Sequence, residues 1–317
     1  MKYSFLIIGV GNIGFRHFQS INLIRNSKIF LVDPNIKKIL SKKLKPELNS
    51  SNKYFFFENI KDIKNVKFNV VIISTSSKER FSNFKYIVTE KISKNIILEK
   101  VLFSNLNLYY KYLELNRNYK FNCWVNCLNR IYPISREIKK ENKKSKPLQI
   151  IVKGFDWGIA CNFIHFLDLA SFLCRTNKIK KVSSVLEEVF KSKRNGFLEF
   201  FGIIKVELSN GTKVIFISNK GNLSYNIKII YNTKIYNINE IQNTCKIYYK
   251  NTVKSHKLEI PKVSELTARI VRLILKKKAP GLVTLKNSLD LHYPVIESIC
   301  NSLSIKNNKK IVDCKIT

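Results

Sequence analysis

The chain has 317 residues, 45% of them hydrophobic and 12% aromatic, a size and composition that favour two folded domains and exclude a disordered chain. The 57 Lys and Arg residues against 22 Asp and Glu give a formal net charge of +35, which raises nucleic acid or an anionic membrane as partners. Only ten of the 57 are Arg, the residue preferred for phosphate contacts, so a compositional drift toward Lys, Asn and Ile explains the charge better than polyanion binding.

The first part of the chain alternates short β-branched runs with polar stretches of helix length. Strands are expected at 4–10, 29–33, 54–57, 70–74 and 96–98, with helices such as 14–26 and 78–91 between them. Apolar runs without alternation are typical of strands buried on both faces of a parallel sheet. The sequence therefore predicts a doubly wound α/β domain over residues 1–122.

The second part, residues 123–317, has a different rhythm. Strands are expected at 121–128, 150–155, 185–190, 197–208, 214–218, 225–231, 233–238 and 246–249, and helices at 158–174, 264–277 and 285–303. Ser264 is the expected N-cap of the second helix, and Asn210-Gly211 is expected to supply the positive φ angles of a hairpin turn. The Lys/Asn run 139–146 is expected to be a solvated helix end or loop. The sequence predicts an α+β domain with an open-faced, mainly antiparallel sheet.

Cysteine usage and apolar runs bear on the compartment. No apolar run approaches the ~18–20 residues that span a bilayer, and the start of the chain resembles a buried strand more than a signal peptide. Seven cysteines, an odd number, suit a reducing compartment better than a disulfide framework, and their spacing does not favour a metal site. We expect a cytoplasmic protein without a metal, a nucleic-acid partner or a membrane.

A glycine-rich motif directly follows the first expected strand. It has the sequence Gly9-Val10-Gly11-Asn12-Ile13-Gly14, and a helix is expected next. In that context the glycines allow a tight turn, a close approach of backbone to a pyrophosphate, and close packing of helix on strand. A tight strand–helix turn without a ligand is the alternative. We expect a dinucleotide site to which Gly9, Gly11, Asn12, Ile13 and Gly14 contribute.

Polar residues at the ends of two further strands extend this site. Asp33 ends the second strand nineteen residues after Gly14, near the ~20 expected for the acid that binds the ribose hydroxyls. A carboxylate there repels a 2′-phosphate, so NAD is favoured over NADP. Ser74 and Thr75 follow the fourth strand at the carboxyl edge of the sheet, where a cofactor would pass, although ordinary turn polarity explains them nearly as well.

Four segments, taken in order, resemble one family. Ile97-Leu98-Glu99-Lys100-Val101 resembles the Glu-Lys-Pro signature of the glucose–fructose oxidoreductase/inositol dehydrogenase (Gfo/Idh/MocA) family. Segment 125–133 resembles its sixth strand, 158–168 its helix with a His followed three residues later by an Asp, and 284–292 its closing helix. The likeness spans nearly the whole chain. It implies a Rossmann domain, an open-faced sheet domain, and NAD(P)-dependent hydride transfer to or from a sugar, nucleotide sugar or cyclitol.

The resemblance also implies roles for individual residues. Lys100 would be catalytic, because an alcohol that loses a hydride must also lose its hydroxyl proton, and Glu99 and Lys100 would contact the cofactor. His165 would be catalytic or contact the substrate, although a lone His on an apolar helix face is commonly a hydrogen-bonded core residue. Asp168 would orient that imidazole or cap a neighbouring group. The plausible substrate-pocket residues are Asn126, Arg130, Asp156, Trp157, Asn162 and His165.

Two departures from the family pattern keep an alternative open. Val101 stands where the family has Pro after Lys, so the bond before it is either trans or a costly non-proline cis bond. Cys161 stands where the family commonly has an Asp, four residues before His165, which makes inositol or glucose oxidation by a Lys-Asp-His set less favoured. The alternative is a catalytically inactive dinucleotide-binding sensor or partner subunit.

A weaker resemblance concerns the substrate. Segments 125–127, 157–162 and 315–317 resemble a subgroup found with surface-polysaccharide and acylneuraminate-type sugar pathways, which points to a nucleotide sugar or modified sugar. The exposed face of an open sheet is costly to leave in water, so we also expect a homo-oligomer, a dimer or tetramer.

Overall fold

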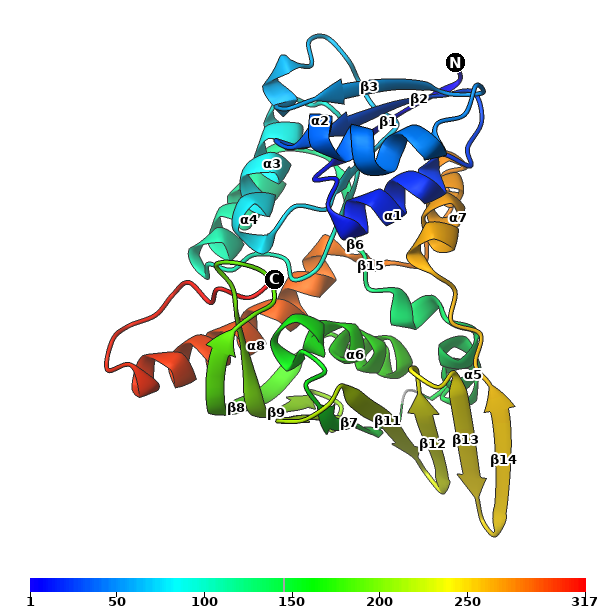
Figure 1. Cartoon of the computed structure of the whole chain (residues 1–317). Helices are drawn as coiled ribbons and strands as arrows, with labels where there is room; N and C mark the ends of the chain where they lie inside the picture. The colour runs from blue at the N-terminus through cyan, green and yellow to red at the C-terminus, as the bar shows by residue number, and fades with distance from the viewer. Residues whose placement is uncertain (145) are drawn as a thin grey trace. The chain divides into compact units, whose positions relative to one another are not determined.

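The computed structural model describes residues 1–144 and 146–317, which form two compact units (Figure 1). The first unit comprises Met1–Phe103, Tyr110–Asn126 and Pro261–Thr284, and the second comprises Ser104–Tyr109, Cys127–Ile260 and Leu285–Thr317. The expected boundary after residue 122 treats each domain as one continuous stretch. In the structure the chain instead enters the second unit briefly at Ser104–Tyr109 and returns to the first at Pro261–Thr284.

The first unit is built on a seven-stranded sheet. Its strands, in the spatial order β15-β6-β5-β4-β1-β2-β3, are β15 (Val283–Thr284), β6 (Asn122–Val125), β5 (Asn95–Leu98), β4 (Val70–Ile73), β1 (Tyr3–Ile8), β2 (Ser27–Val32) and β3 (Lys53–Phe57). All neighbours are parallel except β15 and β6. The four residues of β4 are all buried, as expected of a strand covered on both faces.

Helices follow the strands of this unit in the doubly wound manner. They are α1 (Asn12–Ile21), α2 (Ile36–Ile39), α3 (Ser77–Thr89), most of α4 (Asn107–Asn118) and α7 (Val263–Leu275). The last of these comes from late in the sequence and packs on the first, where the Ala268 N–H donates to Ser20 Oγ at 2.8 Å. A late segment thereby completes the first unit.

The second unit is built on an eight-stranded sheet. Its strands, in the spatial order β14-β13-β12-β11-β7-β10-β9-β8, are β14 (Thr252–Lys257), β13 (Thr244–Tyr249), β12 (Lys234–Asn239), β11 (Ser224–Tyr231), β7 (Gln149–Phe155), β10 (Lys213–Asn219), β9 (Leu198–Leu208) and β8 (Ile179–Lys191). Only the β7–β10 pair is parallel. The predicted fold class, a doubly wound parallel sheet followed by a mainly antiparallel open sheet, is confirmed.

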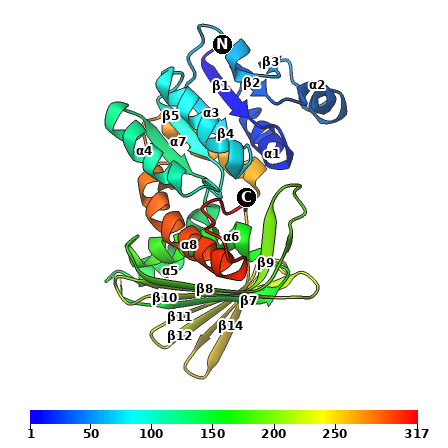
Figure 2. The same ribbon diagram turned by 90° about the vertical axis from the view of Figure 1, so that its left-hand side faces the viewer.

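One face of this second sheet is covered by helices. Figure 2 shows α6 (Ile159–Cys174) and α8 (Leu285–Lys306) on the same side of it, and α5 (Pro133–Glu141) is the third helix of the unit. Ser184 of β8 anchors α8, because its Oγ lies 2.9 Å from Ser298 Oγ and 2.8 Å from Ser302 Oγ. Among the described helices, none has both the length and the apolarity needed to cross a membrane.

Several local expectations need correction. Helix α7 begins at Val263 after an N-cap at Lys262, whose N–H donates to the Glu265 carboxylate at 3.2 Å, so Ser264 is not the cap. In the β9–β10 hairpin only Gly211 has a positive φ, of +85°, and Asn210 does not share it. The run 139–146, by contrast, agrees with the expectation: residues 139–141 end α5, and Lys140, Glu141, Lys143, Lys144 and Lys146 are exposed. Residue 145 lies outside the described residues.

Candidate functional site

The glycine motif forms the turn between β1 and α1. Gly9 has φ +83°, a conformation that L side chains rarely adopt. A Cβ at Gly14 would lie 1.9 Å from the Gly9 carbonyl oxygen, so the helix approaches the strand too closely for any larger residue. Ser74, just after β4, donates from Oγ to that same carbonyl at 2.7 Å. Ser74 therefore braces the loop from the neighbouring strand.

Asp33 meets this loop from the end of β2. Its Oδ2 accepts from the Val10 N–H at 2.8 Å, and its Oδ1 accepts from the Asn35 N–H at 2.9 Å. The parallel pairing of β1 with β2 brings the two segments together, since Ile8 lies beside Val32 in the register. The expected ribose-binding carboxylate and the expected pyrophosphate loop are thus in direct contact.

Three observations test whether this edge of the sheet fits a dinucleotide. A Cβ at Gly11 would meet no described atom within 4 Å, so the loop is open on that side. Helix α1 starts without a side-chain cap on its N–H groups among the described residues, an arrangement suited to phosphate. Thr75 Oγ1 is buried and has no hydrogen-bond partner there. The residues fit a dinucleotide, with Asn12 exposed and Ile13 half-buried at the helix start.

Glu99, at the end of β5, is the centre of a buried polar cluster. His17 Nε2 on α1 lies 3.0 Å from Glu99 Oε1, and Asn126 Nδ2 donates to the same oxygen at 2.6 Å. The other ring nitrogen of His17, Nδ1, lies 2.8 Å from Thr267 Oγ1 on α7. Both partners of the ion pair are buried, the side chains being 1% and 8% exposed. Asn126, expected in the substrate pocket, directs its amide at Glu99.

The hydrogen bonds of this cluster bear on the charge of Glu99. Thr267 Oγ1 donates its proton to the Val263 carbonyl at 3.0 Å, so its oxygen is left to accept from His17 Nδ1. Burial alone would raise the pKa of Glu99, but the hydrogen bond and charge of His17, the Asn126 amide and the Lys100 ammonium lower it from 4.5 to about 2.

The Glu99→Gln variant tests this ion pair. The pKa of Glu99 is depressed in the folded protein, so its stabilisation is fully present above pH 4.5 and is lost as the pH falls toward 2. We expect the variant to have a much lower Tm at neutral pH, because it removes the buried carboxylate that His17 and Asn126 both contact. The difference in Tm between variant and wild type should narrow below pH 4.5. Thermal unfolding of both proteins across that range measures it, and a gap that does not change with pH contradicts the assignment.

Lys100 follows Glu99 at the carboxyl end of β5. It is half-buried, its N–H lies 3.3 Å from Glu99 Oε2, and the Lys100–Val101 peptide bond is cis. Of the two options that the sequence left for this bond, the structure has the cis form. Lys100, Asp33 and the glycine loop all lie at the carboxyl edge of the first sheet, where ligands bind in open α/β folds.

In the second unit, the start of α6 carries the remaining expected residues. Gly158 has φ +70° and serves as the N-cap, and Cys161, Asn162 and His165 keep partial exposure on an otherwise mostly buried helix. Asn162 Nδ2 donates to the Trp157 carbonyl at 2.8 Å, which fastens the turn before the helix. His165 therefore lies on the more open side of α6.

A carboxylate does stand at this helix start, although Cys161 replaces the expected Asp. Glu199 of β9 is buried, and its Oε1 accepts from the Ala160 N–H at 2.6 Å. Burial raises the pKa of Glu199, and hydrogen bonds from Ala160, Phe200 and Cys161 offset part of that effect. Because a negative group is favourable at a helix N-terminus, Glu199 acts here as the cap that Gly158 cannot provide.

Asp168 pairs with Arg130. Its Oδ1 and Oδ2 accept from Arg130 Nη2 and Nε, both at 2.7 Å, and the Asp168 side chain is fully buried. Of the two roles expected for Asp168, the structure shows support of a neighbouring group. Arg130, expected in the substrate pocket, directs one edge of its guanidinium at this carboxylate.

Trp157 and Asp156 lie just before α6. Trp157 is buried, its Nε1–H donates to the Ile217 carbonyl at 2.8 Å, and its ring contacts Phe166 and Tyr225. Asp156 is half-buried with φ +40°. The structure thus places Trp157 in the core of the second unit, and a substrate contact for it stays a prediction.

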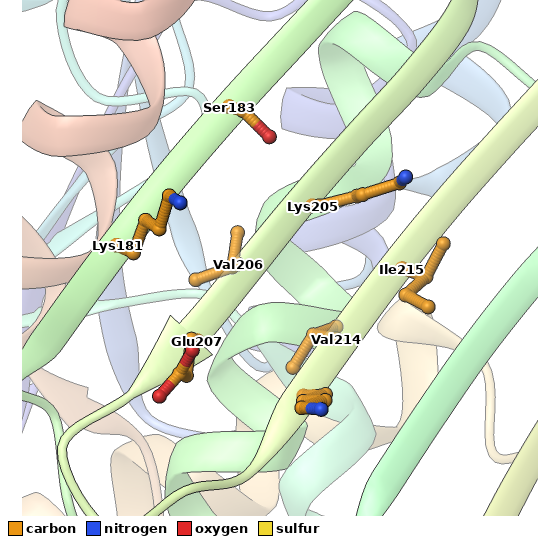
Figure 3. A pocket seen from close by; sticks show the side chains of 8 residues that line it. Lys181, Ser183, Lys205, Val206, Glu207, Val214 and Ile215 are labelled. Carbon is orange, nitrogen blue, oxygen red and sulfur yellow. The ribbon is translucent and has the colours of Figure 1, made fainter.

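One cavity lies away from these residues, on the strands β8, β9 and β10. It has a volume of about 220 Å³, and Figure 3 shows Lys181, Ser183 and Lys205 among the residues that line it. Successive side chains of a strand point to opposite faces of the sheet. Ser184 contacts α8, so its neighbour Ser183, and the cavity that Ser183 lines, lie on the face opposite to that helix. This is the face expected to contact other copies of the chain.

Three supporting residues were not anticipated: His17 and Arg80 in the first unit, and Glu199 in the second. Arg80 of α3 donates from its guanidinium to the Thr75, Val101 and Leu102 carbonyls. Glu199 had a weak signal, because it is an acid directly before the apolar residues Phe200–Ile204 of β9. His17 had a weaker one, a His among the apolar residues of a helix start. Arg80 had none, since an Arg in a helix ordinarily points to solvent.

Comparisons with known proteins bear on the whole chain. No protein-family model and no curated protein matches the sequence. Solved structures do match. A Gfo/Idh/MocA family oxidoreductase from Vibrio cholerae has a TM-score of 0.72 at 15% identity, over 97% of this chain and all of that one. This chain has the Gfo/Idh/MocA fold.

Two further structures share the Gfo/Idh/MocA fold of this chain. UDP-N-acetylglucosamine 3-dehydrogenase GnnA from Acidithiobacillus ferrooxidans has a TM-score of 0.70 at 14% identity and covers 94% of this chain and 99% of its own. An oxidoreductase from Agrobacterium radiobacter, crystallised with NAD+, L-tartaric acid and magnesium, has a TM-score of 0.72 at 12% identity and covers 95% and 97%. The resemblance seen in four short segments thus extends to the fold of both units.

Proposed function

We propose that this chain is an NAD-dependent oxidoreductase of the Gfo/Idh/MocA family that transfers a hydride between the nicotinamide and a hydroxyl or keto carbon of a sugar, with a nucleotide sugar as the favoured substrate. The observation that carries the proposal is the meeting of three features at one sheet edge. The glycine loop, Asp33 and Lys100 follow β1, β2 and β5, and the Asp33 carboxylate is bonded to the loop.

The chain's own residues account for cofactor binding. The N–H groups at the start of α1 face an open loop at Gly11, which suits a pyrophosphate, and the Thr75 hydroxyl is available as a further hydrogen-bonding group. The Asp33 carboxylate accepts hydrogen bonds from ribose hydroxyls and repels a 2′-phosphate. The excess of lysines gives a positive field that favours an anionic cofactor and an anionic substrate.

The residues that would handle the proton are Lys100 and His165. NAD, when bound, supplies the site that accepts or returns a hydride. Oxidation of an alcohol also requires a base for the hydroxyl proton, and reduction requires an acid. Lys100 fits that role because its backbone N–H is held by the buried Glu99 carboxylate at the expected position. His165 is proposed as a second proton-transfer or substrate-binding group, with Asn162 beside it on α6, and Asn126 and Arg130 stay proposed substrate contacts.

Turnover with a panel of sugars tests the proposal. Purified protein is mixed with NAD or NADH and with free sugars, cyclitols and UDP-linked sugars in their hydroxyl and keto forms, and absorbance of the reduced cofactor is followed. We expect turnover with at least one nucleotide sugar. Tight NADH binding without turnover across the panel would instead favour a dinucleotide-binding sensor or partner subunit.

The Asp33→Asn variant tests the cofactor preference. Removing the negative charge removes the repulsion of a 2′-phosphate, so the ratio of NADPH to NADH affinity is expected to rise by about tenfold or more. Fluorescence titration with both reduced cofactors measures the two dissociation constants. Asp62→Asn, which neutralises an exposed Asp on the same unit, is the matched control and should leave the ratio unchanged. An unchanged ratio in Asp33→Asn would remove Asp33 from the ribose site.

The setting of the reaction belongs to the same proposal. None of the seven cysteines forms a disulfide in the structure, and an odd number of cysteines suits a reducing compartment, so we propose that the reaction takes place in the cytoplasm. A homo-oligomer formed through the outer face of the second sheet stays a prediction.

A further inference from the structure

Arg80 of α3 is a buried cation within the first unit. It is only 1% exposed and is the largest of the fully buried side chains. Burial of a charge is costly unless the charge is well hydrogen-bonded. Its guanidinium donates to three backbone carbonyls: from Nη2 to Thr75, and from Nη1 to Val101 and to Leu102, the last at 3.2 Å.

These carbonyls belong to two loops of the candidate site. Thr75 lies just after β4, and Val101 and Leu102 lie just after β5, which is the parallel neighbour of β4. One guanidinium therefore fastens the two loops that carry Thr75 and Lys100. The Val101 carbonyl is only one residue beyond Lys100, and Val101, Leu102 and Phe103 are all fully buried. Movement of the Arg80 side chain would be passed directly to the Lys100 backbone.

The geometry points to Arg80 as a positioning residue for Lys100, an inference that rests on the proposed oxidoreductase function. Lys100 is held on both sides: Glu99 accepts from its N–H, and Arg80 holds the carbonyl of the next residue. The planar, forked guanidinium reaches acceptors in both loops at once. A Lys side chain keeps the charge but offers a single ammonium, so it cannot donate to the carbonyls of both loops at once.

The experiment compares Arg80→Lys and Arg80→Met with a matched control, Phe84→Leu. Phe84 is fully buried one turn further along α3 and contacts Tyr112 and Phe121, so its substitution loosens the helix without removing a hydrogen bond to either loop. Each protein is measured for Tm, NADH affinity by fluorescence, kcat and KM, and backbone hydrogen exchange of residues 99–103.

We expect both Arg80 variants to lower kcat by about 100-fold, with a smaller effect on NADH affinity, because a displacement of about 1 Å in a catalytic group has an effect of that size. Exchange of residues 99–103 should accelerate, while that of the glycine loop stays as in wild type. Phe84→Leu, at a comparable loss of Tm, should retain both kcat and the slow exchange.

Two results overturn the inference. One is an Arg80→Lys variant whose kcat equals that of wild type or falls no further than the kcat of Phe84→Leu. The other is unchanged exchange of residues 99–103. If the wild-type protein itself shows no turnover on any substrate, the proposed function fails, and the exchange measurement still decides whether Arg80 holds the Lys100 loop.

Discussion

Replacing Lys100 by Met is expected to lower turnover by about 10²–10⁴-fold, the range over which a positioned acid or base contributes. Met has a similar length and no ionisable group, so the change removes the proton-transfer group while the surrounding fold is kept. NADH affinity should change little, because the glycine loop and Asp33 contact each other without Lys100. Steady-state kinetics and a fluorescence titration measure the two effects separately.

A matched control strengthens this test. Lys94→Met places the same change at the opposite end of β5, on an exposed side chain. We expect this control to retain wild-type kcat. If Lys100→Met retains turnover as well, Lys100 is not the proton-transfer group, and the role implied by the resemblance to the Glu-Lys-Pro signature is wrong.

The second large effect concerns stability. Asp168→Asn is expected to lower the free energy of unfolding by about 3–5 kcal/mol, because it leaves the half-buried guanidinium of Arg130 without its fully buried carboxylate partner. The pair is bidentate at 2.7 Å, and Arg130 and Asp168 side chains are 13% and 0% exposed. Denaturant unfolding of wild type and variant measures the difference.

The same chain offers an exposed ion pair for comparison. Lys180 Nζ lies 2.9 Å from Glu207 Oε1, with side chains 67% and 29% exposed. Glu207→Gln should lower the free energy of unfolding far less than Asp168→Asn does, since surface pairs contribute little. In the double variant Asp168→Leu with Arg130→Met, stability should recover in part. If Asp168→Asn lowers the free energy of unfolding by as little as Glu207→Gln does, the ion pair between Asp168 and Arg130 does not make the stabilising contribution inferred here.

The sequence is most informative where local rules and tertiary structure agree. Buried parallel strands such as Val70–Ile73 are unbroken apolar runs, and the turn at Gly9 needs a positive φ, so both were predictable from the residues alone. β14, Thr252–Lys257, was missed because all six of its residues are exposed and it carries no apolar alternation. It forms only because β13 offers a partner edge.

The supporting residues of the site were less predictable than the residues they support. Asp33 and Lys100 follow strands at motif spacing. His17 and Glu199 act on elements distant in sequence, and Arg80 joins two loops whose carbonyls lie 5 to 22 positions away. His17 meets Glu99 from 82 positions away, and Glu199 reaches Ala160 from 39 positions away. No periodicity records such contacts, because they depend on how the elements pack. The return of residues 261–284 to the first unit was unpredictable for the same reason, because it depends on the packing of α7 on α1.

The most direct test of the oxidoreductase assignment follows the hydride itself. Nucleotide sugars deuterated at their ring carbons are incubated with the protein and NAD, and the reduced cofactor is examined by mass spectrometry. We expect the protein to transfer one deuterium from a sugar carbon to the cofactor, and Lys100→Met nearly to abolish the transfer. Recovery of NAD without reduction, or of reduced cofactor that carries no deuterium, would contradict this assignment.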